Sequence, residues 1–231
     1  MSALIGVLGG MGPLATVDFL RKLVERTSAT CDQEHVPLIV YSVPQIPDRI
    51  AGMRGSGASP LPAMRTGIQM LERSGARAIA IPCNTAHYWY DELARDCGVP
   101  LLHIADSACA VLGNKVANVG LLATSATLAA GFYQQRLAAL GLGCVINRQD
   151  EVDAWVMRGI GLVKAGDVPG GGALLQQALA ALFERGAERV ILGCTETPLA
   201  LERVAAPQLP LCVDATAALA DACIRWSRQN A

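Results

Sequence analysis

Two segments of the chain, GARAIAIPCNTA (75–86) and GAERVILGCTET (186–197), align without a gap at an offset of 111 residues. Both open with Gly-Ala and run through a short aliphatic stretch. Each then places a cysteine, Cys83 or Cys194, before small polar residues. An aliphatic run bounded by Gly or Pro is typical of a buried strand, so each cysteine is expected to follow a strand directly.

A second pair of segments repeats at nearly the same distance. IGVLGG (5–10) matches VGLLAT (119–124) at an offset of 114. An internal repeat usually marks a repeated structural unit. The sequence therefore predicts two pseudo-symmetric lobes, residues 1–113 with the first cysteine and residues 114–231 with the second. The final helix is a candidate to pack back onto the first lobe.

Short aliphatic runs alternate with longer segments in which apolar residues recur at helical spacing. The runs predicted as buried strands are 4–8, 38–43, 78–81, 101–104, 118–122, 190–193 and 209–213. The segments predicted as helices are 15–28, 64–74, 128–140 and 174–185. This alternation predicts an α/β fold in which each lobe has a largely parallel sheet flanked by helices. Residues 44–60, rich in Pro and Gly, are predicted as an irregular loop that either closes over a substrate or merely connects elements.

The composition is that of an ordinary globular protein. Of the 231 residues 52% are hydrophobic and 17% charged, and the net charge is −1, which offers no basic surface to nucleic acid. No run approaches the roughly 18 apolar residues of a membrane span, and the first residues lack the basic start of a signal peptide. A cytoplasmic protein without a membrane partner is therefore expected.

Eight cysteines could suggest a disulfide framework or a metal site. They include no CxxC pair and no short Cys/His cluster, and a chain of this size does not need disulfides to hold its core. No metal is therefore expected. Cys97, Cys109, Cys144 and Cys223 lie in Ala- and Leu-rich contexts and are predicted to be small buried hydrophobic residues.

Cys83 and Cys194 differ from the others because each follows a predicted strand and precedes a helix. In open α/β sheets, ligands bind in the crevice outside the carboxyl ends of the strands. The positive end of a helix favours a thiolate there. Two lobes related by approximate two-fold symmetry would aim these thiols at one cleft from opposite sides. Inverting a stereocentre needs a base on one face and an acid on the other, so the repeat predicts racemisation by two thiols in matched surroundings.

Small polar residues accompany the cysteines and the first strand of the second lobe. The candidates to bind a substrate α-carboxylate are Asn84, Thr85, Thr124, Thr127, Thr195 and Glu196. Hydroxyls, amides and free backbone N–H groups could hold the carboxylate and stabilise the charge that develops on deprotonation. Helix N-capping selects the same residue types, and for Thr127 it is an equal alternative.

At this point the chain resembles a known family. The motifs are GGMGPLAT (9–16), PQIPDR (44–49), PCNTAH (82–87), GLLATSAT (120–127), VMRG (156–159), VKAG (163–166) and GCTE (193–196). They resemble the aspartate/glutamate racemase family, and within it the aspartate racemases, over essentially the whole chain. The resemblance implies two pseudo-symmetric α/β lobes, an amino-acid substrate, no pyridoxal phosphate, no metal and a homodimer.

The resemblance also assigns roles to residues. It implies that Cys83 and Cys194 are the acid/base pair. It places Met11 and Gly12, together with the Asn and Thr residues named above, around the α-carboxylate and ammonium groups. Arg49 of PQIPDR and Lys164 of VKAG match positions that hold the side-chain carboxylate in aspartate-acting members. A second carboxylate needs such cationic donors on charge grounds alone.

Several alternative functions share parts of these motifs. Glutamate racemases resemble one another in an Asp-Ser-Gly start and a His after the second Cys-Thr, where this chain has GGMGP (9–13) and Glu196. Hydantoin racemases and maleate isomerases of the same superfamily stay open, as does a non-catalytic ligand-binding protein. GMGPLA (10–15) fits a dinucleotide fingerprint, but Pro13 removes an N–H group and no acidic residue ends the second strand.

The histidines suggest one further alternative. His87, four residues after Cys83, could form a Cys–His nucleophile pair with it. Along a helix, however, His87 should point away from the thiol. A structural or surface role is therefore expected for His87, and also for His35 and His103.

Overall fold

The computed structural model describes residues 2–113 and 116–231. The chain divides into two compact units, one of Met1–Ser107 with Thr216–Ala231 and the other of Ala108–Ala215. The boundary expected after Gly113 adjoins residues 114–115, which lie outside the described residues. The division falls before that boundary, and the C-terminal segment belongs to the first unit.

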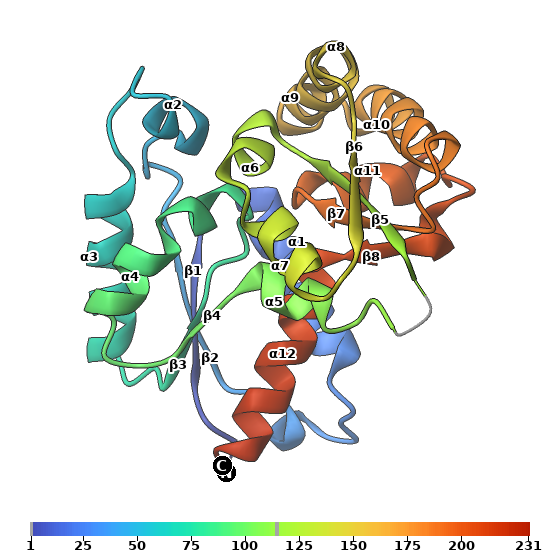
Figure 1. Ribbon diagram of the computed structural model, residues 1–231. Coiled ribbons are helices and arrows are strands. Elements are labelled where there is room, and N and C mark those ends of the chain that lie inside the picture. Colours follow the sequence, from blue (N-terminus) through green and yellow to red (C-terminus); the bar gives the residue numbers. More distant parts are fainter. Residues whose placement is uncertain (1, 114–115) are drawn as a thin grey trace. The chain divides into compact units, whose positions relative to one another are not determined.

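Each unit contains a four-stranded parallel sheet (Figure 1). In the first, β1 (Ile5–Gly9), β2 (Leu38–Ser42), β3 (Ala78–Ala80) and β4 (Leu101–Leu102) lie in the order β2-β1-β3-β4. In the second, β5 (Asn118–Ala123), β6 (Gly143–Ile146), β7 (Arg189–Gly193) and β8 (Cys212–Asp214) lie in the order β6-β5-β7-β8. The equivalent strand orders confirm the predicted fold class, an α/β protein with two related parallel sheets.

Helices connect the strands in both units. Those of the first unit are α1 (Pro13–Arg26), α2 (Arg49–Met53), α3 (Leu61–Arg73), α4 (Tyr90–Asp96) and α12 (Ala215–Gln229), with 3-10 helices Asp32–Glu34 and Thr85–Trp89. Helix α5 (Ile104–Cys109) follows β4. Those of the second unit are α6 (Ser125–Ala130), α7 (Phe132–Ala139), α8 (Gln149–Glu151), α9 (Arg158–Lys164), α10 (Val168–Glu184) and α11 (Glu196–Arg203), with a π-helix Val152–Met157 and a 3-10 helix Leu209–Leu211.

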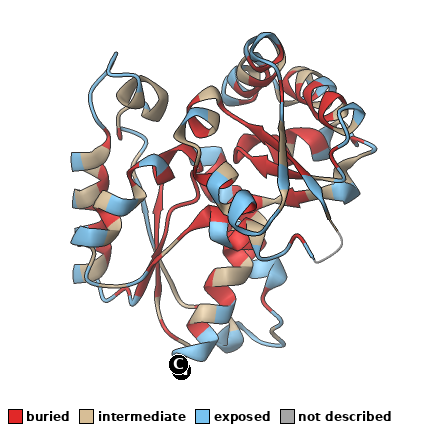
Figure 2. Ribbon diagram, viewed as in Figure 1, coloured by how far each residue is buried: buried red, intermediate tan, exposed pale blue. Residues whose placement is uncertain are grey.

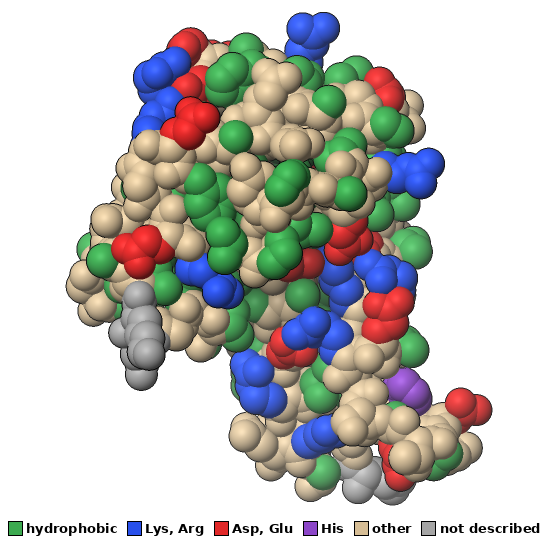
Figure 3. Space-filling model, turned by 90° about the vertical axis from the view of Figure 1, so that its right-hand side faces the viewer, with side chains coloured by type: hydrophobic (Ala, Val, Ile, Leu, Met, Phe, Trp, Pro, Cys, Tyr) green, Lys and Arg blue, Asp and Glu red, His purple; other side chains and the backbone are tan. Residues whose placement is uncertain are grey.

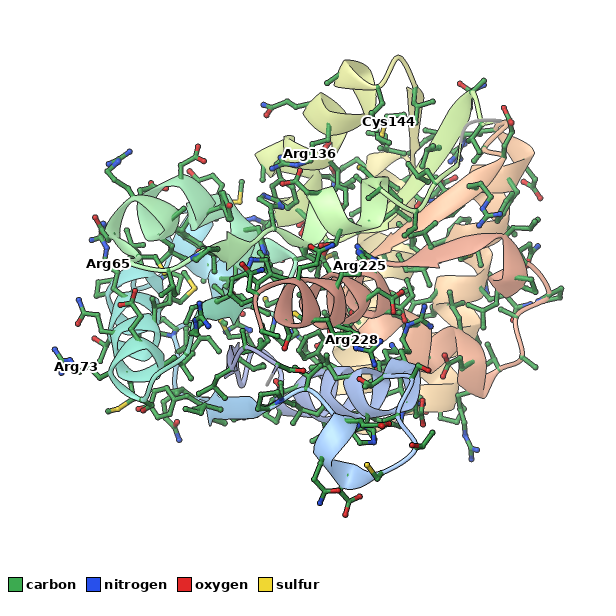
Figure 4. The ribbon with its side chains drawn as sticks, turned by 90° about the horizontal axis from the view of Figure 1, so that it is seen from below. Arg65, Arg73, Arg136, Cys144, Arg225 and Arg228 are labelled. Atoms are coloured by element: carbon green, nitrogen blue, oxygen red, sulfur yellow. The ribbon has the colours of Figure 1, made fainter. Side chains whose placement is uncertain are left out.

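The first unit packs helices on both faces of its sheet. Figure 1 shows α3 and α4 on one side and α12 on the other. Arg65 of α3 forms an ion pair with Asp96 across 2.7 Å, and α12 is tied to the N-terminal segment by the bond from the Ala3 N–H to the Ser227 carbonyl (2.9 Å). Arg228 of α12, labelled with Arg65 in Figure 4, donates to the Ser28 carbonyl.

The second unit is built around α10, which packs on β5 and β7 and against α9 and α11. Its core consists of buried aliphatic side chains from the sheet and these helices, among them Leu122, Leu175, Leu179, Leu192 and Leu201. Figure 2 shows the inner strands β5 and β7 as buried, whereas the edge strand β6 is only partly so. Burial of this apolar surface is the main force that holds the sheet against its helices.

The structure corrects two predictions in the second unit. Strand β6 (Gly143–Ile146) was not predicted, because an edge strand with half-exposed side chains lacks the apolar run of a central strand. The helix predicted at 128–140 is two helices, α6 and α7. They meet at Gly131, whose φ of 73° is the left-handed conformation that ends a helix.

Three further segments differ from expectation. The loop 44–60 contains the short helix α2, which Asp48 caps by accepting the Ala51 N–H at 2.8 Å. The run 101–104 is a strand only over Leu101–Leu102, because α5 begins at Ile104. In the run 209–213 the strand β8 begins only at Cys212, after the 3-10 helix.

The surface carries charges of both signs. On the face drawn in Figure 3, basic and acidic side chains are interspersed among apolar and polar ones, which agrees with the net charge of −1. Within the described residues, no helix combines the length and the apolar character that crossing a bilayer requires.

Candidate active site

Cys83 follows the carboxyl end of β3 by three residues and precedes the 3-10 helix Thr85–Trp89. Its side chain is 6% exposed and belongs to a buried cluster that also contains Met11, Ile46 and Ile81. The Cys83 N–H donates to the Ile81 carbonyl at 2.8 Å, which closes a tight turn after the strand. The thiol is therefore at the sheet edge where ligands bind in parallel α/β folds.

The glycine-rich loop after β1 is held by Thr16, which was not among the residues predicted for the site. The Gly10 N–H donates to the Thr16 hydroxyl at 2.8 Å, and that hydroxyl donates to the Gly12 carbonyl at 2.9 Å. Gly10 has a φ of +92°, and a Cβ there would lie 2.4 Å from the Val43 carbonyl carbon. The loop therefore presents Met11 and Gly12 in one conformation. The threonine that closes GGMGPLAT was the available signal.

Three more candidate residues of the first unit lie near Cys83 in the chain or in space. Asn84 and Thr85 are buried directly after it. Arg49 begins α2, which packs against the 3-10 helix Thr85–Trp89. The Arg49 guanidinium donates to the carbonyls of Ile46 and Pro47, each at 3.2 Å, so its own loop orients it. The remaining guanidinium donors could bind a carboxylate.

In the second unit, strand pairing places two candidates side by side. Ala123 of β5 and Gly193 of β7 are register partners, so Thr124 and Cys194 follow at neighbouring positions on the same sheet edge. The Thr124 hydroxyl accepts the Thr127 N–H at 3.1 Å and donates to the Thr127 hydroxyl at 3.0 Å. Thr124 is thus the N-cap of α6, and Thr127 contributes its N–H to that cap.

Cys194 is buried against a carboxylate. Its thiol donates to Glu196 Oε2 at 3.0 Å, and the Thr195 hydroxyl donates to the same oxygen at 3.1 Å. Burial, then the charge of Glu196 and the hydrogen bond to it, raise the pKa of the Cys194 thiol well above its ordinary value. The expectation that the helix N-terminus favours a thiolate is therefore wrong for Cys194, because burial first and the adjacent Glu196 carboxylate second disfavour the charged sulfur.

Glu196 also connects Cys194 to a lysine. Lys164 ends α9, and its Nζ lies 3.7 Å from Glu196 Oε1. The Lys164 side chain is 45% exposed, whereas that of Glu196 is 7% exposed, so the ion pair runs from the interior to solvent. The second unit thus brings Lys164, Cys194, Thr195 and Glu196 into one contact network. All four are candidates from the sequence, but local sequence patterns do not predict their pairing.

The other six cysteines differ in how far they are buried. All eight are free thiols. Cys223 is fully buried as predicted, but Cys97, Cys109 and Cys144 are only partly buried, which corrects the expectation for these three. Cys144 lies on the edge strand β6 (Figure 4). Over residues 2–113 and 116–231, no three His, Cys, Asp or Glu side chains lie where they could share a metal ion.

Comparison with known proteins gives concordant findings. A family model described as Asp/Glu/hydantoin racemase matches residues 8–223. An aspartate racemase structure from Picrophilus torridus is 33% identical with a TM-score of 0.85, covering 98% of this chain and 94% of that one. The broad specificity amino-acid racemase RacX of Bacillus subtilis is 28% identical, covering 94% and 95%. A glutamate racemase from Desulforudis audaxviator is 34% identical over 159 residues, which are 65% of this chain and 56% of that protein.

Proposed function

Because the chain belongs to the Asp/Glu/hydantoin racemase family, we propose that it interconverts L- and D-aspartate by proton transfer between Cys83 and Cys194. The observation that carries this proposal is the equivalent placement of the two thiols. Each follows the carboxyl end of the third strand of its own sheet, β3 or β7, and each is a buried free cysteine. Glutamate is the alternative substrate.

The proposed reaction needs one thiolate and one thiol. The thiolate removes the α-proton from one face of the amino acid, and the thiol delivers its proton to the opposite face. The product is the other enantiomer, and the two sulfurs have exchanged protonation states. A reverse turnover, or proton exchange with solvent, restores the starting state. No electrons are transferred, and the only bonds that break and form are bonds to hydrogen.

The contacts of Cys194 support its role as the initial acid. Glu196 beside it favours the protonated thiol, so Cys194 is placed to donate in the first turnover and Cys83 to abstract. In the reverse direction Cys194 must act as the base. It is then the thiolate that the forward turnover leaves, because Cys194 has given its proton to the product.

The candidate binding residues divide by charge. In the proposal, the substrate α-carboxylate binds the hydroxyl, amide and backbone N–H groups of Met11, Gly12, Asn84, Thr85, Thr124, Thr127 and Thr195. The side-chain carboxylate binds Arg49 and Lys164, and a substrate carboxylate at Lys164 would share that ammonium with Glu196. Such charge-assisted contacts are the strong ones in carboxylate recognition. The similarity to the aspartate racemase from Picrophilus torridus supports aspartate as the substrate. Because the chain is also similar to RacX and to a glutamate racemase, the test includes other amino acids.

The family resemblance also bears on the location, the oligomeric state and the cofactor requirement of the enzyme. As the family resemblance implies, we propose a cytoplasmic homodimer that works without pyridoxal phosphate, a metal or nucleic acid. Size-exclusion chromatography with light scattering measures the oligomeric state. A monomeric mass in an active preparation would remove the dimer from the proposal and leave the reaction intact.

The test of the function is racemisation of L-aspartate in D2O, with a thiol reductant and no added cofactor. Loss of optical rotation together with α-deuterium in the product is the expected result. The absence of both racemisation and α-deuterium uptake with L-aspartate, L-glutamate and other amino acids would overturn the proposal. Conversion of maleate to fumarate by the same preparation would instead assign the isomerase reaction, in which a thiol attacks an alkene.

A further inference from the structure

His87 links the Cys83 main chain to the start of another helix. It lies in the 3-10 helix Thr85–Trp89 and is 4% exposed. Its Nδ1 lies 2.9 Å from the Cys83 carbonyl oxygen. Its Nε2 lies 3.2 Å from the N–H of Ile104, the first residue of α5. The ring therefore bridges the Cys83 main chain and the first residue of α5, which lies 17 residues after His87 in the chain.

The two partners fix the protonation state of the ring. A carbonyl oxygen only accepts hydrogen bonds, so His87 Nδ1 carries the hydrogen and donates to Cys83. A backbone N–H only donates, so Nε2 is unprotonated and accepts from Ile104. The imidazole is neutral with both nitrogens engaged by main chain. It is thus not a base for the Cys83 thiol, which agrees with the expectation that His87 is structural.

These contacts hold the Cys83 main chain on both sides of its Cα. The Cys83 N–H donates to the Ile81 carbonyl at 2.8 Å, and the Cys83 carbonyl accepts from His87 at 2.9 Å. With both flanking peptides fixed, the direction of the Cα–Cβ bond is fixed as well. The sulfur then keeps only the rotation about that bond. Proton transfer depends steeply on the donor–acceptor distance, so such fixing matters for a thiol that must reach a substrate Cα.

In the second unit a backbone N–H binds the corresponding carbonyl. There the Cys194 carbonyl accepts the Thr197 N–H at 3.1 Å, in the turn that opens α11. At the repeat offset of 111, the position equivalent to His87 is Pro198, which has no side-chain donor. A backbone N–H therefore serves the Cys194 carbonyl, whereas an imidazole N–H serves the Cys83 carbonyl.

Neighbouring rings keep the imidazole in place. The ring centroids of His87 and His103 are 4.7 Å apart, and those of His103 and Tyr90 are 4.4 Å apart. The Tyr90 hydroxyl donates to the Leu101 carbonyl at 2.9 Å, and His103 Nδ1 accepts the Ala105 N–H at 3.0 Å. The packed rings leave His87 little freedom to rotate away from Cys83.

We infer that His87 is the positioning residue of Cys83, holding its carbonyl through Nδ1–H so that the thiol is aligned for proton transfer. The inference rests on the proposed racemase function. It predicts that loss of the donor to Cys83 lowers turnover, whereas loss of the acceptor for Ile104 costs stability alone.

Two substitutions separate these contacts. His87→Asn places an amide N–H where Nδ1–H was and keeps the bond to Cys83. His87→Gln places a carbonyl oxygen where Nε2 was, keeps the bond to Ile104 and abandons Cys83. We expect kcat of His87→Gln to fall about 10- to 100-fold with little change in KM, as for a misplaced reacting group. His87→Asn should stay within about threefold of the wild type, since its positioning bond is retained.

Proton exchange in D2O distinguishes a positioning role of His87 from a merely structural one. In His87→Gln, α-deuterium uptake by the enantiomer that Cys83 deprotonates should slow more than uptake by the other. Equal slowing of both enantiomers, or equal kcat in the two variants, would overturn the inference. Absence of any racemisation by the wild-type protein would overturn the proposed function instead.

Nitrogen-15 NMR of the imidazole rings in the wild-type protein tests the inference without relying on a variant that folds. We expect His87 to show a protonated Nδ1 and an unprotonated Nε2 at neutral pH. The opposite tautomer, or a doubly protonated ring, would contradict the bond to Cys83 and overturn the inference.

Discussion

The thiol of Cys194 donates a hydrogen bond to Glu196 at 3.0 Å, whereas the position equivalent to Glu196 in the first unit is Thr85. The internal repeat suggested matched surroundings for the two thiols, and this difference corrects that expectation. A buried carboxylate next to a buried thiol disfavours the thiolate. Burial and this carboxylate together raise the pKa of Cys194, whereas in the first unit a threonine takes the place of the carboxylate.

Replacing Glu196 with glutamine should shift the titration of Cys194 to lower pH. The substitution removes a negative charge and leaves a side chain of the same size, so the electrostatic repulsion that raises the pKa of Cys194 disappears while burial, the largest cause, remains. Alkylation by iodoacetamide as a function of pH, resolved by peptide mass spectrometry for each cysteine, measures the shift.

Glu202→Gln, an exposed change on the same helix α11, is the matched control and should leave the alkylation profile of Cys194 unchanged. An unchanged or higher midpoint in Glu196→Gln would show that burial alone sets the pKa of Cys194. The carboxylate would then have no part in its protonation.

Serine at either cysteine should abolish racemisation, with a loss of about 100-fold or more, because a positioned acid or base contributes that much to proton transfer. Each variant should still exchange the α-proton of one enantiomer, through the thiol that remains. Cys83→Ser and Cys194→Ser should therefore label opposite enantiomers of aspartate in D2O. Turnover near normal in either variant, or the same enantiomer labelled by both, would contradict the two-thiol mechanism.

The strands that carry the candidate thiols could be predicted from sequence because they are central and buried on both faces. β1, β3, β5 and β7 read as apolar runs for that reason, and the repeat located Cys83 and Cys194 at their ends. The edge strand β6 escaped prediction because its side chains are half-exposed. The break between α6 and α7 depends on one glycine in the left-handed conformation, which periodicity does not reveal.

The contacts between candidate residues were harder to predict than the residues themselves. Glu196 was named as a binding residue, but its place between Cys194 and Lys164 depends on how α9 and α11 pack. The bonds of His87 depend on the start of α5, far along the chain. Pairing between side chains on separate elements is a tertiary property, and local sequence patterns carry no information on it.

Arg49→Ala should lower kcat/KM for aspartate roughly tenfold or more and leave that for alanine nearly unchanged, because a charge-assisted bond to a carboxylate contributes about 1.5 to 3 kcal/mol. Alanine has no second carboxylate for Arg49 to hold. Arg54→Ala, just after the end of the same helix α2, is the control. Equal losses with both substrates would mean that Arg49 acts only through its bonds to the Ile46 and Pro47 carbonyls.

Stability should decline in alkaline solution because of Cys223. This residue of α12 is fully buried, and burial raises the pKa of its thiol from 9.0 to about 12. Between these two values the unfolded chain loses the proton while the folded chain keeps it. The free energy of unfolding should therefore fall as pH rises through this window, by about 1.4 kcal/mol per pH unit for one such group. Below pH 9 Cys223 should contribute no slope.

Urea denaturation at several pH values between 8 and about 11 tests this expectation by comparing Cys223→Ala with the wild type. The variant should lose part of the alkaline slope. The rest should come from the other thiols whose pKa burial raises, which are Cys212 with a pKa of about 12, Cys97 with a pKa of about 11, Cys144 and Cys194. Cys31→Ala, which replaces an exposed thiol, is the control and should keep the full slope. Identical slopes in Cys223→Ala and the wild type would mean that α12 admits solvent to its buried face before the protein unfolds.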